Sequence, residues 1–191
     1  MSEWLSPTPP LVVLTLYVMK KMISDLTYKV VALSEVTQLD QNECINWAME
    51  MLELGYESPS LLILSACDKS SSYFEIKSYL EDAVNELGFK IKTGDSGVIS
   101  YSYYFINEIS LKRNVRSNLT ELYRFCQQRD YEGIIHEFYL LYWAWDQIEY
   151  DDTNDNHYWA GMNKGSIKDT VIRIANSWKI ENKEHYIQHT I

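Results

Sequence analysis

Residues 130–155 have the sequence DYEGIIHEFYLLYWAWDQIEYDDTND, an aromatic run that ends in an acidic tail. At 100° per residue, a helix over about 132–150 places apolar side chains on one face, at Ile134, Phe138, Leu141, Trp145 and Ile148. Its opposite face carries Glu132, His136, Tyr139, Trp143, Asp146 and Tyr150. A helix that is apolar or aromatic on almost every side is usually buried on more than one side. We therefore predict that this aromatic helix is central and that the other helices pack around it.

The length suits one domain over residues 1–191, and the periodic pattern of apolar residues along the chain indicates the all-α class. A chain of this size buries roughly 70% of the surface that its unfolded form exposes, so it needs no disulfide or metal to fold. Helical periodicity recurs along the chain, and we find no internal repeat. We predict an irregular bundle of about seven to nine helices.

Local start and stop signals place most of these helices. A first helix is predicted over 23–39, and Asp40 with Glu43 marks the start of the next, which Gly55 ends. Further starts are predicted at Ser58 with Pro59, at Ser72 with Glu75, at Ser117 or Asn118, at Asp130 for the aromatic helix, and at Ser166 with Asp169. The segment from Val98 to Asn114 fits both a strand and a helix, and its length favours a helix.

Three segments bear on domain organisation. Residues 1–22 are either part of the fold or an appendage, because Met19 and Met22 are alternative starts. Residues 89–97, which include Gly94, Asp95, Ser96 and Gly97, form the strongest loop pattern and separate two halves. Residues 181–191 are expected to fray.

A resemblance supports the helical fold. Trp47-Ala48, Met51-Leu52, Gly55-Tyr56, Ser58-Pro59 and Leu61 to Leu64 resemble the opening motif of a group of small, uncharacterised bacterial all-helical proteins. The later Tyr131-Glu132-Gly133 before an aromatic helix is similar too, so the resemblance covers roughly 40–155. It implies a fold and no activity. Bacterial immunity proteins are similar in size and charge only.

The charge distribution favours a basic partner. The formal net charge is −10 and the pI is about 4.8, which argues against nucleic-acid binding because that depends on Lys and Arg. Basic residues gather between Lys112 and Arg129, whereas 130–163 contain eight carboxylates and neither Lys nor Arg. Either these segments form solvated faces that pair with each other, or the acidic one binds a cationic partner.

Other classes of site find little support. The apolar run from Leu11 to Met19 is too short to span a bilayer, which takes about 20 residues. Cys44, Cys67 and Cys126 form no close pair, which is typical of reduced thiols in a cytoplasmic protein. A calcium loop that begins at Asp152 would have His157 in place of Gly and Asn163 in place of the bidentate Glu. We predict no metal and no cofactor.

Two functional hypotheses follow. The first is a non-enzymatic protein that binds a basic protein partner, of immunity or antitoxin type, through an aromatic and acidic surface. Its predicted contact residues are Tyr139, Trp143, Asp146, Tyr150, Asp151, Asp152 and Asp155. The alternative is a hydrolase-like enzyme whose site is assembled from His136, Asp146, Glu149 and His157. A self-associating scaffold is a third possibility, and the sequence does not predict the oligomeric state.

Overall fold

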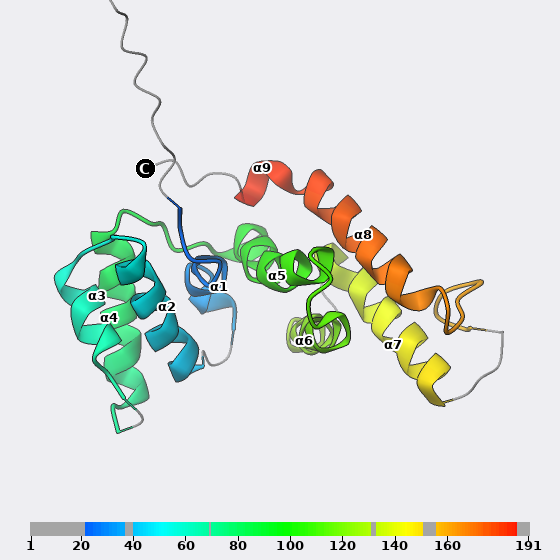
Figure 1. The fold of residues 1–191 in the computed structure, drawn as a ribbon, viewed down its shortest axis with the longest axis horizontal. Helices are drawn as coiled ribbons and strands as arrows, with labels where there is room; N and C mark the ends of the chain where they lie inside the picture. The colour runs from blue at the N-terminus through cyan, green and yellow to red at the C-terminus, as the bar shows by residue number, and fades with distance from the viewer. Residues whose placement is uncertain (1–21, 37–39, 69, 131–132, 151–155, 187–191) are drawn as a thin grey trace, which may run out of the picture.

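The structure is a computed structural model that describes residues 22–36, 40–68, 70–130, 133–150 and 156–186. In this part of the chain every regular element is helical, which confirms the all-α class and the expected number of helices (Figure 1). The elements are α1 (Thr27–Val30), η1 (Leu33–Glu35), α2 (Gln41–Glu53), α3 (Pro59–Ser65), α4 (Tyr73–Glu86), α5 (Gly94–Ser110), α6 (Val115–Gln128), η2 (Gly133–Ile135), α7 (His136–Tyr150), α8 (Ile167–Glu181) and α9 (Lys183–Tyr186).

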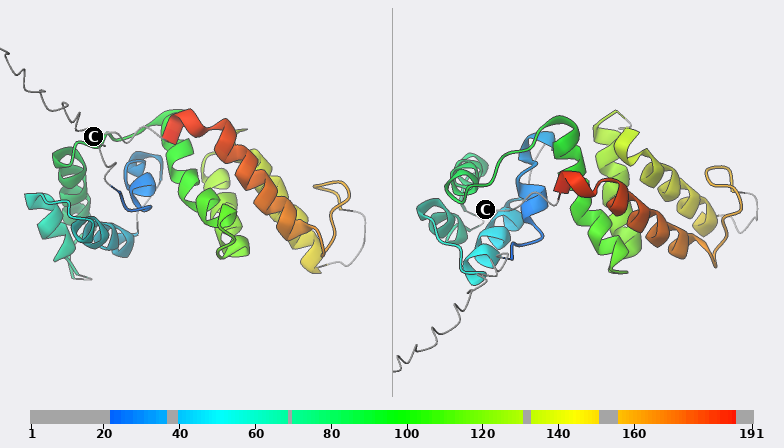
Figure 2. Two further views of the ribbon diagram at one scale, coloured as in Figure 1. Left: turned by 45° about the horizontal axis from the view of Figure 1, so that its top comes forward. Right: turned by 90° about the horizontal axis from the view of Figure 1, so that it is seen from above.

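Buried apolar side chains form two clusters. The first lies among α1 to α4 and includes Trp47, Met51, Leu61, Leu64 and Leu80. The second lies among α5 to α8 and includes Ile106, Leu119, Phe138, Leu141 and Val171. Two half-buried side chains, Val36 and Tyr104, pack against both clusters. The molecule is therefore elongated, with α2, α3 and α4 at one end and α7 and α8 at the other (Figures 1 and 2).

Helix α5, and not the aromatic helix α7, lies in the middle of the molecule. Helix α5 packs against α1, α6, α8 and α9, whereas α7 lies at one end of the molecule (Figure 1). The buried stripe of α7 also differs from the predicted one, because it follows Phe138, Leu141, Ala144 and Ile148. Ile134 and Trp145, which the helical wheel placed on this stripe, are only half-buried.

Three predicted helix starts are confirmed together with their side-chain caps. Asp40 accepts the N–H groups of Asn42 and Glu43, and Ser58 accepts that of Leu61 with Pro59 in the first turn. Ser72 and Glu75 form a reciprocal capping box. Each bond satisfies a backbone donor that the first helical turn leaves without a partner.

The predicted first helix is wrong. Residues 27–30 form one turn of α1, and the chain then continues as the short η1. The β-branched run around Val30 and Val31 is a poor helix former, and both side chains are buried in the first cluster. Tertiary packing rather than helix propensity thus determines this segment.

Residues 94–97 begin α5 and do not form a loop. Thr93 makes no side-chain cap, and the carboxylate of Glu35 accepts the N–H of Gly94 at 2.8 Å instead. Glu35 also pairs with Arg129 at 2.5 Å. A Cβ atom on Gly97 would lie 2.5 Å from Glu35 Cγ and 2.8 Å from the carbonyl oxygen of Lys92. Glycine is needed here because η1 approaches the backbone of α5 closely.

A buried lysine joins the two clusters. The side chain of Lys29 on α1 is 6% exposed, and its Nζ lies 2.5 Å from Glu43 on α2. The same ammonium group lies over the rings of Phe105, Tyr104 and Tyr101 on α5, at 4.8, 5.1 and 5.6 Å from their centroids. One cation therefore holds a carboxylate of the first half and three rings of the second.

Several predicted boundaries in the second half shift. Helix α6 begins at Val115, after Asn114 in the left-handed region, and not at Ser117 or Asn118. Asp130 does not cap the aromatic helix, which begins at His136 after η2. Helix α8 begins after Ser166 as predicted, although the Ser166 side chain makes no cap.

The C-terminal segment includes one short helix. Helix α9 covers Lys183–Tyr186, within the residues that were expected to fray. Residues 187–191, like residues 1–21, lie outside the described part of the chain.

Replacing Gly97 with Ala is expected to lower the free energy of unfolding by about 1–3 kcal/mol, because the new methyl group overlaps Glu35 and the Lys92 carbonyl. Helix propensity alone would favour Ala over Gly by about 1 kcal/mol, so the sign of the change is informative. Urea unfolding measures the free energy of unfolding of both proteins. Gly133→Ala is the matched control, because a Cβ atom there meets nothing within 4 Å. A Gly97→Ala protein at least as stable as wild type would contradict the close approach.

Replacing Lys29 with Ala is expected to cost about 2–4 kcal/mol of unfolding free energy, since the change removes a buried stem and leaves Glu43 without its cation. Lys29→Met should cost less, because it keeps the packing. Lys77→Ala is the control: its pair with Glu81 is exposed at 3.9 Å, and such pairs contribute about 0–1 kcal/mol. Equal losses for Lys29→Ala and Lys77→Ala would refute a structural role for the buried cation.

Candidate functional site

The face of α7 that was predicted to point outward is partly covered by aromatic rings. Tyr123, on α6, stacks on Tyr142 with a centroid distance of 3.8 Å and on Tyr139 with one of 5.6 Å. It also meets Trp143 edge-on at 5.6 Å. Tyr139 and Trp143 are consequently half-buried. The rings stabilise the contact between α6 and α7 and still leave part of this face accessible.

The segment after α7 contributes a further ring. Asn156 is buried and donates from its amide to the carbonyl oxygen of Ala144 at 2.8 Å. Its Oδ1 accepts the N–H groups of Tyr158 and Trp159, which fixes the turn. Tyr158 then stacks on Trp143 with a centroid distance of 5.9 Å and remains 43% exposed. Asn156 thus has a structural role in the segment that was compared with a calcium loop.

The carboxylates of α7 are paired within the chain. Arg116, on the first turn of α6, donates to Asp146 at 3.3 Å and to Glu149 at 2.9 Å. Both acidic side chains nevertheless stay about half exposed, at 44% and 52%. Within the described residues the basic segment before residue 130 therefore does pair with the acidic segment after it, through Arg116. One positive charge does not neutralise two carboxylates.

The C-terminal end of α7 is the most exposed part of this face. Tyr150 is 94% exposed and lies next to Glu149. We define the α7 surface as a set of six half-buried or exposed aromatic and acidic residues at this end of the molecule: Tyr139, Trp143, Asp146, Glu149, Tyr150 and Tyr158. The predicted contact residues Asp151, Asp152 and Asp155 lie outside the described residues.

The residues of the enzyme hypothesis do not assemble into one site. His136 begins α7, and Asp146 follows ten residues later, so the two lie about 15 Å apart along the helix axis. His136 stacks on Tyr139, and Asp146 and Glu149 meet at Arg116. His157 is exposed, and its backbone N–H donates to Gln147. In the described residues these groups therefore form no common pocket for a general acid and base.

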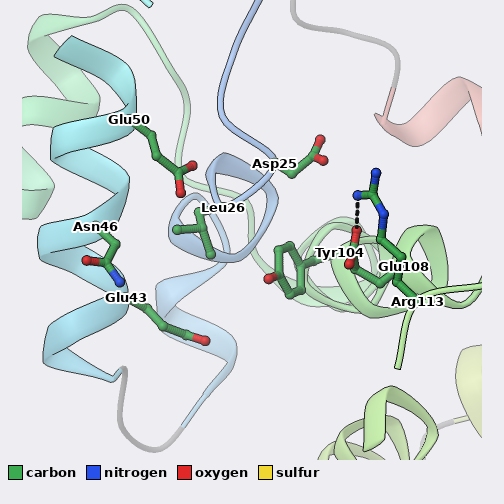
Figure 3. Close-up of a pocket in the computed structure, with 8 residues that line it drawn as sticks. All are labelled: Asp25, Leu26, Glu43, Asn46, Glu50, Tyr104, Glu108 and Arg113. Atoms are coloured by element: carbon green, nitrogen blue, oxygen red, sulfur yellow. Dashed lines mark hydrogen bonds and ion pairs between the residues drawn. The ribbon is translucent and has the colours of Figure 1, made fainter. Parts of the chain in front are cut away.

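A second acidic surface was not predicted from the sequence. It is a cavity of about 450 Å³ where α1, α2 and α5 meet (Figure 3). Four carboxylates line it, from Asp25, Glu43, Glu50 and Glu108, together with Asn46, Leu26, Tyr104 and Arg113. Figure 3 shows the side chains of α2 on one side of the cavity and those of α5 on the other. We call it the acidic cleft.

The carboxylates of the acidic cleft affect a neighbouring phenol. Burial, and then the charges of Glu43 and Glu108, raise the pKa of the Tyr104 hydroxyl above its usual value. Three of the four carboxylates in the cleft already have partners. Glu43 pairs with Lys29, Glu108 pairs with Arg113 at 3.1 Å, and Glu50 accepts a hydrogen bond from the hydroxyl of Ser24. The cleft residues come from three separate segments, so no local spacing could have revealed them.

Among the described residues no group of three or more His, Cys, Asp or Glu side chains is placed to hold a metal ion. In the same part of the chain no helix combines the length and the apolar character that crossing a membrane requires. Comparison with protein-family models, curated proteins and solved structures gives no significant match. The resemblance to small bacterial helical proteins therefore stays a prediction.

The cysteines are expected to differ strongly in reactivity. Burial, assisted by Glu43 and Asp40, raises the pKa of Cys44 to about 12, so at pH 8 only on the order of 10⁻⁴ of this thiol is ionised. Cys126 is also buried, whereas Cys67 is half-exposed. Iodoacetamide at pH 8 should label Cys67 first, and the other two only in urea, as measured by peptide mass spectrometry. Early labelling of Cys44 would contradict its burial.

Proposed function

We propose that the protein acts without catalysis, by binding a basic protein partner through the α7 surface. The observation that carries the proposal is the 94% exposure of Tyr150 beside the carboxylates of Glu149 and Asp146. Tyrosine and tryptophan are common anchors of protein interfaces, and neighbouring carboxylates attract a cationic partner. The net charge of −10 supports the same partner class.

The specific form of the proposal is a cytoplasmic neutraliser of a basic toxin. Bacterial immunity proteins are similar to this chain in length and acidity, and they act by binding alone. Such a protein needs a rigid surface with exposed anchors and no catalytic group. The ring stack of Tyr123, Tyr139 and Trp143 would supply this rigidity, since it holds the α7 surface against α6.

The α7 surface is preferred over the acidic cleft because it combines exposed rings with carboxylates. Tyr158 is 43% exposed and Tyr150 more so, whereas Tyr104, the ring in the cleft, is half-buried between the two core clusters. Truncation of an exposed ring removes little packing within the protein. Its effect on binding can therefore be separated from its effect on stability.

The double variant Tyr150→Ala/Glu149→Lys is expected to lose at least about tenfold in affinity for the partner, since an anchor ring and its attractive charge are both removed. The partner is first captured from a lysate of the source cells with the tagged wild-type protein, and binding is then measured by surface plasmon resonance. Association should also slow as salt rises.

The control Phe74→Ala/Asp25→Lys removes another ring, which is 81% exposed, and makes the same charge change in the acidic cleft. It should bind nearly as well as wild type. If the control loses the partner and the α7 variant keeps it, the proposed location is refuted. If no basic protein is captured, the proposed function itself is refuted.

A further inference from the structure

A guanidinium group of the chain itself already lies on α7. Arg116 Cζ is 4.5 Å from the ring centroid of Tyr142 and 5.7 Å from that of Trp145, and the side chain pairs with Asp146 and Glu149. These four residues follow the spacing i, i+3, i+4 and i+7, so they form one stripe of the helix. Rings below and carboxylates beside a planar cation are the groups that proteins use to bind arginine.

The match between Arg116 and this stripe is incomplete. Both carboxylates contact the same nitrogen, Nη2, at 3.3 and 2.9 Å. Nη1 is buried and has no hydrogen-bond partner within the described structure. A better placed guanidinium would pair two nitrogens with two carboxylate oxygens. The stripe also keeps an excess of one negative charge over the charge of Arg116.

Arg116 has room beside it. A cavity of about 350 Å³ adjoins its side chain and that of Trp145, with Val115 and Lys168 also in its lining. This is the adjoining space that a displaced guanidinium would enter. Lys168 would repel it there, so the stripe remains the preferred position when no other cation competes.

We infer that the stripe formed by Tyr142, Trp145, Asp146 and Glu149, which shares its two carboxylates with the α7 surface, recognises an arginine side chain of the partner. Arg116 occupies this arginine site until the partner displaces it. This inference rests on the proposed function, to which it adds the chemistry of the partner and an internal competitor. The partner's arginine would stack on Tyr142 and Trp145 and pair with Asp146 and Glu149.

The test measures binding of a fluorescent nona-arginine peptide to the whole protein by anisotropy at low salt. Arg116→Ala is expected to lower the Kd about tenfold, as follows if the site is open in wild type only about a tenth of the time. The affinity for nona-lysine should rise less in the Arg116→Ala variant, because an ammonium group neither stacks on a ring nor pairs with two oxygens as a guanidinium does. Arg116→Gln, which keeps most of the stem, repeats the test if Arg116→Ala does not fold.

The matched control is Arg124→Ala. It makes the same charge change on α6, where Arg124 pairs with Glu121 at the surface. Equal gains for the Arg116 and Arg124 variants would reduce the effect to net charge and overturn the inference. The inference is also overturned if Arg116→Ala still raises the affinity for nona-arginine after Asp146→Asn and Glu149→Gln are added. A different result is the capture of a basic partner whose binding depends on Tyr150 and Glu149 while Arg116→Ala leaves the affinity for nona-arginine unchanged. That result would leave the proposed function intact and refute only the arginine site.

Discussion

The two halves of this molecule are joined through a short segment, 27–35, that supplies the buried cation of Lys29 and the carboxylate of Glu35, whose side chain is 9% exposed. Lys29 pairs with Glu43 of α2 and lies over three rings of α5. Glu35 binds the first amide of α5 and Arg129 at the end of α6. A buried charge is costly unless it is paired, so each of these contacts restricts how α5 sits against the first half. The position of α5 in turn determines where α6 and α7 pack.

The same pairing explains the charge of the surface. Arg116 and Arg129, two of the five basic residues between 112 and 129, are used within the fold, against α7 and against Glu35. Arg113 and Arg124 pair with nearby glutamates, Glu108 and Glu121. The basic segment is therefore largely neutralised locally. The sequence offered two interpretations: two faces that pair with each other, or an acidic face that binds a cationic partner. In the structure Arg116 pairs with two carboxylates of the acidic segment, Asp146 and Glu149, and both stay about half exposed.

Three local helix caps were predictable from the sequence, and the contacts between distant residues were not. Ser72 and Glu75 cap α4 because both partners lie within one turn, so their spacing alone predicts the bond. Gly94 looked like a loop residue because its cap, Glu35, lies 59 residues earlier. The aromatic character of α7 was predicted correctly. Its buried stripe and its place at one end were not, because they depend on which side α6 and α8 approach. The acidic cleft could not be predicted, since its residues come from three elements.

The two acidic surfaces would contribute differently to the proposed function. In the cleft, Glu43, Glu108 and Glu50 already have partners, so a ligand there would compete with bonds that hold α1 and α5. Its charge still adds to the field that attracts a basic protein over roughly one Debye length, about 8 Å at physiological salt. The α7 surface has exposed rings, which act only at contact. Attraction by the whole molecule and anchoring at α7 are thus separable: the first depends on salt and on net charge, and the second on Tyr150 and its neighbours.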